Sequence, residues 1–238
     1  HDIYHIDKKK CMTGCNCENC ELKALFFQNV PETELVFLCN TRHERIYKKG
    51  ETIIEQGAEI KEFSYLKTGL VKLFKHVDNG KSQIIKIAGP LDFINLLSIF
   101  SDRYFQYSVT ALEDTTVCYV DIETVKEMVK KNGNFALDLL QKMSRMTDEI
   151  INTTLEISRK NLRGRIAFVL LYFARSVYKN NTFELPVSRK EIAEFIEMTP
   201  ENVIRILSEF RKDGIIRING KEISISDERR LSVIADLG

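Results

Sequence analysis

The sequence lacks an apolar run long enough to cross a membrane. Its longest uninterrupted run, IAFVLLYFA at residues 166–174, is shorter than the ~20 residues that a spanning helix needs and is typical of a buried helix. The sequence also lacks a charged-then-apolar secretory pattern, so we expect a cytoplasmic protein without a membrane partner. No paired acid and base and no phosphate-binding loop is recognisable, and we therefore expect no enzymatic activity.

Cysteine is scarce, with 6 in 238 residues, and its distribution is uneven. Cys11, Cys15, Cys17 and Cys20 all fall within CMTGCNCENC, at residues 11–20. In a reducing cytoplasm, clustered cysteines indicate metal or redox chemistry rather than disulfides. Residues 1–20, here called the cysteine-rich arm, therefore predict a metal or redox site.

Net charge is almost absent from the chain as a whole, at +1, but its two parts differ. Residues 159–238 hold 15 Lys and Arg against 11 Asp and Glu, whereas residues 1–158 hold 20 against 23. The C-terminal part is therefore the better candidate for contact with a polyanion.

Residues 45–120 contain short β-rich runs that alternate with turn signals. Asn79-Gly80 lies between two alternating runs and predicts a hairpin. Closely spaced glycines punctuate the remainder, which is typical of a small β-barrel or roll. We assign residues 21–121 to a β-roll sensor domain.

From residue 122 the apolar spacing becomes helical, and residues 122–159 form a predicted dimerisation helix. Mostly apolar residues recur along this helix at alternating intervals of four and three, and they form a narrow stripe like that of a two-helix coiled coil. We expect this stripe to pair with a second copy of the chain, while Leu139 and Met146 contact the chain's own roll. The predicted dimer seam is Ala136, Leu140, Met143, Thr147, Ile150, Thr154 and Ile157.

Residues 160–238 carry the clearest local signals. Ser188 and Glu191 match a capping box that starts one short helix. Thr199 is a suitable N-cap for a second helix, with Pro200 at its first position. A hairpin follows at residues 215–225. The order of helix, turn, helix and two-stranded wing predicts a winged helix-turn-helix domain that binds double-stranded DNA.

The second of these helices presents Glu201, Ile204 and Arg205 on its outer side. Arginine can donate two hydrogen bonds to guanine, and a carboxylate can accept one from cytosine, so we expect these residues to contact bases. Glu201 and Arg205 also have the spacing of an ordinary surface ion pair. The expected phosphate contacts are Arg189, Lys190, Lys212 and Lys221.

This order of β-roll, long helix and winged helix resembles the CRP/FNR family of bacterial transcription regulators over nearly the whole chain. ENVIRIL, residues 201–207, is similar to the family's recognition-helix pattern E-x-x-x-R-[IL]-L. The resemblance implies an α+β fold with a cyclic-nucleotide-binding-like double-stranded β-helix. It also implies a homodimer that contacts RNA polymerase and binds a palindromic site with TGA-like half-sites. In the family the Glu and Arg of this pattern read the half-site, so their roles fall on Glu201 and Arg205, whereas the position of Ile204 varies.

The effector pocket departs from the cyclic-nucleotide branch of the family. In that branch a Glu holds the ribose and an Arg neutralises the phosphate; the corresponding positions here are Leu96 and Tyr107, followed by Ser108. A phosphodiester buried against Leu and Tyr would lack its charge partner. We therefore expect no binding of cyclic AMP.

The oxygen-sensing FNR subgroup is more similar. SVTALEDTTVCYVDIETV, residues 108–125, resembles a subgroup segment with a single cysteine, here Cys118. In the subgroup this cysteine and three from the arm hold an oxygen-labile [4Fe–4S] cluster. The resemblance implies Cys15, Cys17, Cys20 and Cys118 as ligands, with Cys11 as an alternative arm ligand. The subgroup's arm spacing is C-x2-C-x5-C, whereas the spacing here is C-x3-C-x-C-x2-C.

Other interpretations of the cysteines remain open. The four arm thiolates could bind Zn²⁺ alone, and Cys118 could be a small buried side chain with no ligand role. The roll could then hold an unidentified small molecule, or a haem with His43 or His76 as axial ligand. A dithiol redox protein using Cys17 and Cys20 is the alternative from another class, although the arm lacks the βαβ context of such proteins.

Overall fold

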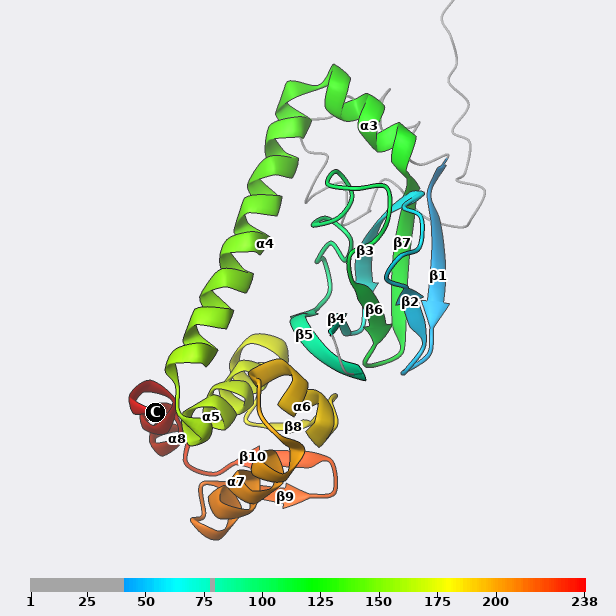
Figure 1. Cartoon of the computed structure of the whole chain (residues 1–238). Coiled ribbons are helices and arrows are strands. Elements are labelled where there is room, and N and C mark those ends of the chain that lie inside the picture. The colour runs from blue at the N-terminus through cyan, green and yellow to red at the C-terminus, as the bar shows by residue number, and fades with distance from the viewer. Residues whose placement is uncertain (1–40, 78–79) are drawn as a thin grey trace, which may run out of the picture.

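The computed structural model describes residues 41–77 and 80–238 and contains a β-roll, a long helix and a C-terminal winged-helix domain (Figure 1). The cysteine-rich arm, the expected first part of the roll and Asn79 of the predicted hairpin lie outside the described residues. No helix in the described ranges is long and apolar enough to cross a membrane.

The β-roll consists of two antiparallel sheets, in the strand orders β1-β7-β3 and β2-β6-β4-β5. Apolar side chains from both sheets fill the space between them, with Phe63, Leu66, Leu73 and Leu96 almost entirely buried. The strands are β1 (His43–Tyr47), β2 (Thr52–Ile54), β3 (Glu62–Thr68), β4 (Val71–Val77), β5 (Lys81–Ala88), β6 (Ser108–Ala111) and β7 (Thr115–Asp121).

The turn between β3 and β4 requires glycine. Gly69 has a φ of +90°, in the left-handed region that side chains rarely adopt. A Cβ atom at this position would lie 2.4 Å from Thr115 Oγ1, so the turn also packs too closely against the start of β7 for any larger residue.

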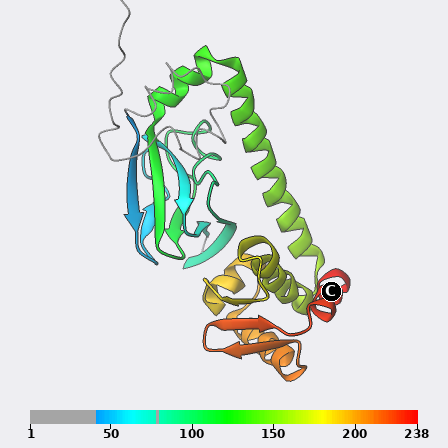
Figure 2. The same cartoon turned by 180° about the vertical axis from the view of Figure 1, so that it is seen from behind.

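Two capped helices continue directly from the roll. Asp121 accepts a hydrogen bond from the Thr124 amide and begins α3 (Ile122–Lys131). Asn132 accepts one from the Phe135 amide and begins α4 (Gly133–Arg159). Figures 1 and 2 show α4 running beside the roll toward the C-terminal domain. Leu139 and Met146 are buried against the roll, which confirms that one face of α4 contacts the chain's own core.

The C-terminal domain has the predicted winged-helix order and one further helix. A sheet in the order β8-β10-β9 packs with the helices around a core that includes Phe173, Leu207 and Phe210. Asp227 caps the further helix, α8, which the sequence reasoning missed. The elements are α5 (Leu162–Tyr172), the π-helix η3 (Phe173–Val177), β8 (Thr182–Glu184), α6 (Arg189–Ile196), α7 (Pro200–Lys212), β9 (Ile216–Asn219), β10 (Glu222–Ile225) and α8 (Glu228–Leu237).

The roll and the winged-helix domain share one apolar cluster. Ile84 and Ile87 of β5 pack with the winged-helix core, and the Tyr172 hydroxyl donates to the Ile87 carbonyl oxygen at 3.0 Å. Lys72 on β4 forms an ion pair with Glu191 on α6 at 2.6 Å. The winged-helix domain is therefore packed directly against the β-roll.

Candidate nucleic-acid interface and sensor site

The helix-turn-helix begins with a complete capping box. Ser188 Oγ accepts from the Glu191 amide at 3.2 Å, and the Glu191 carboxylate accepts from the Ser188 amide at 2.7 Å. Helix α6 ends at Glu197, whose φ of +54° turns the chain sharply. Thr199 then caps α7 by accepting from the Asn202 amide at 3.3 Å, with Pro200 at the first position of the helix. The two helices therefore begin at the residues that the sequence predicts, with a sharp turn between them.

Helix α7 has one buried and one exposed face. Its inner face packs Val203, Ile206, Leu207 and Phe210 into the domain core. Its outer face presents Glu201, Ile204 and Arg205, of which Ile204 is 56% and the Arg205 side chain 54% exposed. In Figure 1, α7 and the β9–β10 wing lie at the end of the molecule away from the roll. All three residues expected to contact bases therefore face solvent.

Arg205 has partners that the sequence reasoning missed. Its Nη1 donates to Glu209 Oε1 at 2.6 Å, and its Nη2 donates to Asn202 Oδ1 at 3.2 Å. Arg205 thus pairs with the carboxylate one turn later in α7 and not with Glu201. Glu201 and Glu209 each lie four residues from Arg205, so the spacing in the sequence does not show which of them forms the ion pair.

The expected phosphate contacts lie around α6, α7 and the wing. Lys212 ends α7 and Lys221 lies at the β9–β10 turn, and both are exposed. Lys190 is exposed in the first turn of α6 and lies 3.7 Å from Glu194. Arg189 is half-buried, and this burial lowers the pKa of its guanidinium. Three of the four side chains therefore present their charge openly.

The predicted dimer seam is divided between two environments. Met143 and Ile150 pack against the roll core, and Ile157 is buried in the winged-helix core. Leu140 is 54% exposed, and Thr147 and Thr154 also face solvent, whereas Ala136 is partly covered. Three of the seven members, Met143, Ile150 and Ile157, therefore contact the chain's own cores, and the seam as a whole stays a prediction. The exposed apolar stripe of α4 consists of Leu137, Leu140, Thr147, Ile151, Thr154 and Leu155.

The two positions at which the resemblance expects partners of a cyclic nucleotide are buried in the roll. Leu96 is 1% exposed and belongs to the core. Tyr107 is also buried, its hydroxyl donates to the Ile94 carbonyl oxygen at 3.3 Å, and burial raises its pKa. Ser108 Oγ accepts from the Gln56 amide at 3.0 Å. Tyr107 and Ser108 therefore already have hydrogen-bond partners within the chain.

Cys118 on β7 is fully buried and in contact with a cation. Arg42 Nε donates to its Sγ at 2.6 Å, and Arg42 Nη2 donates to Glu44 Oε1 at 2.7 Å. The Glu44 carboxylate also pairs with Lys67 at 2.9 Å. Burial raises the pKa of the Cys118 thiol to about 11, against the opposing effect of the Arg42 charge. The sulfur therefore lies in a buried environment that disfavours the thiolate, and the Arg42 guanidinium and a hydrogen bond from Tyr65 oppose this effect.

The chemistry of Cys118 fits one thiolate ligand of a metal cluster. A ligating cysteine must lose its proton; burial raises the pKa of the Cys118 thiol, the Arg42 guanidinium opposes that rise, and a bound metal would have to displace the proton. Across the ranges that the structure describes, no group of three or more His, Cys, Asp or Glu residues could hold a metal ion. Cys11, Cys15, Cys17 and Cys20, the ligands expected from the arm, lie outside those ranges.

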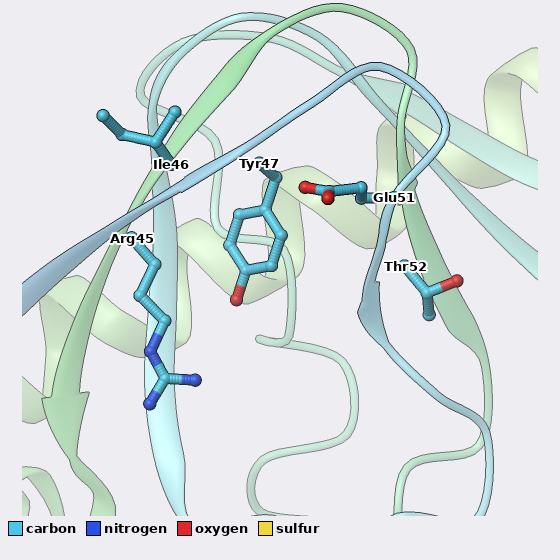
Figure 3. Close-up of a pocket in the computed structure, with 5 residues that line it drawn as sticks. All are labelled: Arg45, Ile46, Tyr47, Glu51 and Thr52. Atoms are coloured by element: carbon cyan, nitrogen blue, oxygen red, sulfur yellow. The ribbon is translucent and has the colours of Figure 1, made fainter.

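An open hollow between β1 and β2 is lined by Arg45, Ile46, Tyr47, Glu51 and Thr52 (Figure 3). Arg45 and Tyr47 point one way and Ile46 the other, as alternation along a strand requires. None of the residues that the sequence singles out lines this hollow, and we assign it no role.

Comparisons with known proteins match both halves of the chain. Residues 44–132 match the family described as cyclic nucleotide-binding domain, and residues 164–234 match the Crp-like helix-turn-helix domain. The chain is 27% identical to the transcriptional activator protein FnrA of Stutzerimonas stutzeri over 235 residues, 96% of each chain. It is 26% identical to the fumarate and nitrate reduction regulatory protein of Escherichia coli over 230 residues, 93% of this chain and 92% of that one.

Solved structures show the same architecture. FixK2 from Bradyrhizobium japonicum is 25% identical, with a TM-score of 0.73 over 81% of this chain and 96% of that one. A transcriptional regulator of the CRP/FNR family from Eubacterium rectale is 19% identical, with a TM-score of 0.77 over 89% of this chain and 97% of that one. The predicted α+β fold is therefore confirmed.

Proposed function

Because this chain belongs to the CRP/FNR family of transcription regulators, we propose that it acts as a homodimer on a palindromic DNA site and senses oxygen through a cysteine-held [4Fe–4S] cluster. It is an FNR-like regulator with a DNA-binding helix-turn-helix domain. The observation that carries the DNA-binding part of the proposal is the capped, outward-facing helix α7, with Glu201, Ile204 and Arg205 on its open face.

Recognition follows from the chemistry of that face. Helix α7 enters the major groove, where Arg205 donates to guanine O6 and N7 and Glu201 accepts from cytosine N4. Ile204 has no polar group and contributes apolar contact, for instance with a thymine methyl group. Arg189, Lys190, Lys212 and Lys221 contact phosphates, which positions the domain without selecting sequence. The expected half-sites are TGA-like.

Dimerisation uses the exposed stripe of α4. Leu140 and Ile151 are large apolar side chains, each at least half exposed, on a helix whose other face is already packed. Pairing this stripe with its copy removes that apolar surface from water. A two-fold dimer then presents two copies of α7 to two half-sites about one helical turn apart. The bound dimer contacts RNA polymerase.

The sensor combines Cys118 with three cysteines of the arm, for which we propose Cys15, Cys17 and Cys20, with Cys11 as the alternative. When bound, a [4Fe–4S] cluster would supply the sensitivity to oxygen. Arg42 supports the thiolate form of Cys118 by placing its charge 2.6 Å from the sulfur. Strand β7 leads through Asp121 into α3 and then α4, which gives the sensor a short covalent route to the dimer helix.

We also propose that cyclic AMP is not the effector. Leu96 and Tyr107 occupy the positions of the family's ribose and phosphate partners, and both are buried with contacts of their own. Neither side chain can neutralise a phosphodiester.

The experiment that tests DNA recognition compares Arg205→Ala with Lys212→Ala on selected and random DNA. Loss of a bidentate base contact is expected to cost about 1–3 kcal/mol on the selected site and to relax one position of that site. Loss of a phosphate contact is expected to weaken binding to all sequences alike and to lower the salt slope by about 1. If Arg205→Ala weakens both DNAs equally, its assignment as a base contact is wrong.

A further inference from the structure

A network of ion pairs connects α5 with the exposed face of α7. Arg163, in the first turn of α5, donates from Nη1 to Glu209 Oε2 at 2.5 Å and from Nη2 to Asp213 Oδ2 at 3.1 Å. Its guanidinium also lies 4.9 Å from the ring centroid of the buried Phe210. The second carboxylate oxygen of Glu209 accepts from Arg205 Nη1 at 2.6 Å. Glu209 therefore has one guanidinium on each of its oxygens.

This arrangement differs from an ordinary surface pair. An exposed Arg–Glu pair one helical turn apart contributes little by itself, because both side chains remain free to move. The Glu209 side chain is only 34% exposed and is held from a second helix by Arg163, which is itself bonded to Asp213. The position of the carboxylate is thus fixed independently of Arg205.

Arg205 keeps enough donors for DNA while it is held. A guanidinium has five N–H groups, and Arg205 uses one on Glu209 and one on Asn202, so three remain. Guanine accepts two hydrogen bonds, at O6 and N7. Contacts within α7 and contact with a base are therefore compatible.

We propose that Glu209, fixed by Arg163, is a positioning residue that holds Arg205 in the orientation of its base contact and so contributes to sequence specificity. The proposal rests on the base-reading role of Arg205 proposed above. A free arginine side chain must lose rotamer freedom when it binds, whereas a side chain already held in place loses less. Glu209 and Arg163 act through Arg205 and need no contact with the base.

The test measures how the full chain discriminates among bases. Fluorescence anisotropy gives the affinity for the selected site with each of the four bases at every half-site position, and Arg205→Ala identifies the position that Arg205 reads. Glu209→Gln keeps the volume of the side chain and removes its charge. At the half-site position that Arg205 reads, this variant is expected to lower the preference for the best base about three- to tenfold. Arg163→Gln is expected to lower the same preference, and Glu209→Gln is expected to change nothing when Arg205 is already Ala.

The matched control is Glu228→Gln, whose carboxylate on α8 pairs with Arg175 of η3 at 2.8 Å and belongs to a separate ion pair, and it should leave the preference unchanged. Thermal unfolding of every variant shows whether the protein is still folded, so that a loss of base preference can be separated from a loss of structure. If Glu209→Gln does not fold, Arg163→Gln takes its place in the test, because it changes no residue of α7. An unchanged or larger preference in a folded Glu209→Gln overturns the positioning role but leaves the base contact of Arg205 standing. If Arg205→Ala relaxes no position, both assignments fall.

Discussion

Lys72 Nζ lies 2.6 Å from Glu191 Oε1, so one ion pair joins strand β4 of the roll to the first turn of helix α6. Both side chains are largely buried, at 14% and 22% exposure. The same Glu191 carboxylate accepts from the Ser188 amide at 2.7 Å and closes the capping box. A single carboxylate therefore contributes to the start of the helix-turn-helix and to its contact with the roll.

Removing the cation of this pair should destabilise the chain. Lys72→Met keeps an unbranched apolar side chain of similar size but removes the ammonium group that pairs with the partly buried Glu191. We expect the free energy of unfolding to fall by about 1 kcal/mol in urea denaturation. Lys75→Met on the same strand is the control, because Lys75 is exposed, and it should change the unfolding free energy much less. Equal effects in the two variants would contradict a stabilising role for the pair.

The contribution of Glu191 should also depend on pH. Burial alone would raise its pKa, but the hydrogen bonds from Lys72 and Ser188 outweigh burial, and the pKa is lowered. Its stabilisation is therefore present above the unfolded pKa of about 4.3 and is lost as the pH falls through the lower folded value. The difference in unfolding free energy between wild type and Lys72→Met should stay constant near neutral pH and shrink below about pH 4. A difference that grows on acidification would contradict this sign.

The exposed stripe of α4 should control dimerisation without controlling the fold. Leu140→Glu places a charge on this stripe and is expected to give a monomer in analytical ultracentrifugation, with the melting temperature of the monomeric fold preserved. Asn152→Glu adds the same charge at an exposed position about 120° round the helix from Leu140, off the stripe, and should leave the dimer intact. A dimeric Leu140→Glu would place the interface elsewhere.

Cyclic AMP should give no saturable heat in titration calorimetry, even at millimolar nucleotide. The reason is that Leu96 and the Tyr107 side chain fill the pocket and offer no positive charge to the phosphate. A saturable isotherm would show that the roll opens for a nucleotide in a way that this packing does not predict.

Cys118 should be necessary for the cluster even when all the arm cysteines are present. Anaerobic reconstitution with iron and sulfide is expected to give brown wild-type protein with visible thiolate-to-iron absorbance, and colourless Cys118→Ser. Cys39→Ser, which removes a cysteine outside the proposed ligands, should remain brown. A zinc-only arm predicts colourless protein with unchanged metal content in all three. Equal colour in wild type and Cys118→Ser would remove Cys118 from the site.

Local signals in the sequence were sufficient for the fold, but not for the contacts between distant elements. The capping box of Ser188 and Glu191 depends on neighbouring residues and could be predicted directly. Helix α8 was missed although Asp227 is a suitable N-cap, because the short segment follows the wing without a strong apolar pattern. The contact between Arg42 and Cys118 joins residues 76 positions apart, and no local pattern predicts it.

The position of the exposed α4 stripe and the partner of Arg205 also could not be predicted from local sequence signals. Met143 and Leu140 are equally apolar, so periodicity finds the stripe but does not say which members face the roll and which face solvent. Arg205 has a glutamate four residues away on either side, and the choice of Glu209 coincides with a contact from Arg163 on α5. Both outcomes depend on packing between elements that are separate in the sequence.

The central claim is sequence-specific DNA binding by α7, and selection from random DNA tests it most directly. The purified chain, kept without oxygen, is incubated with a random duplex library, and bound sequences are enriched and read. The account predicts a palindrome with TGA-like half-sites about one helical turn apart, and predicts that Arg205→Ala loses preference at one position of each half-site. Enrichment of no sequence, or of the same sequence by wild type and Arg205→Ala, would contradict it.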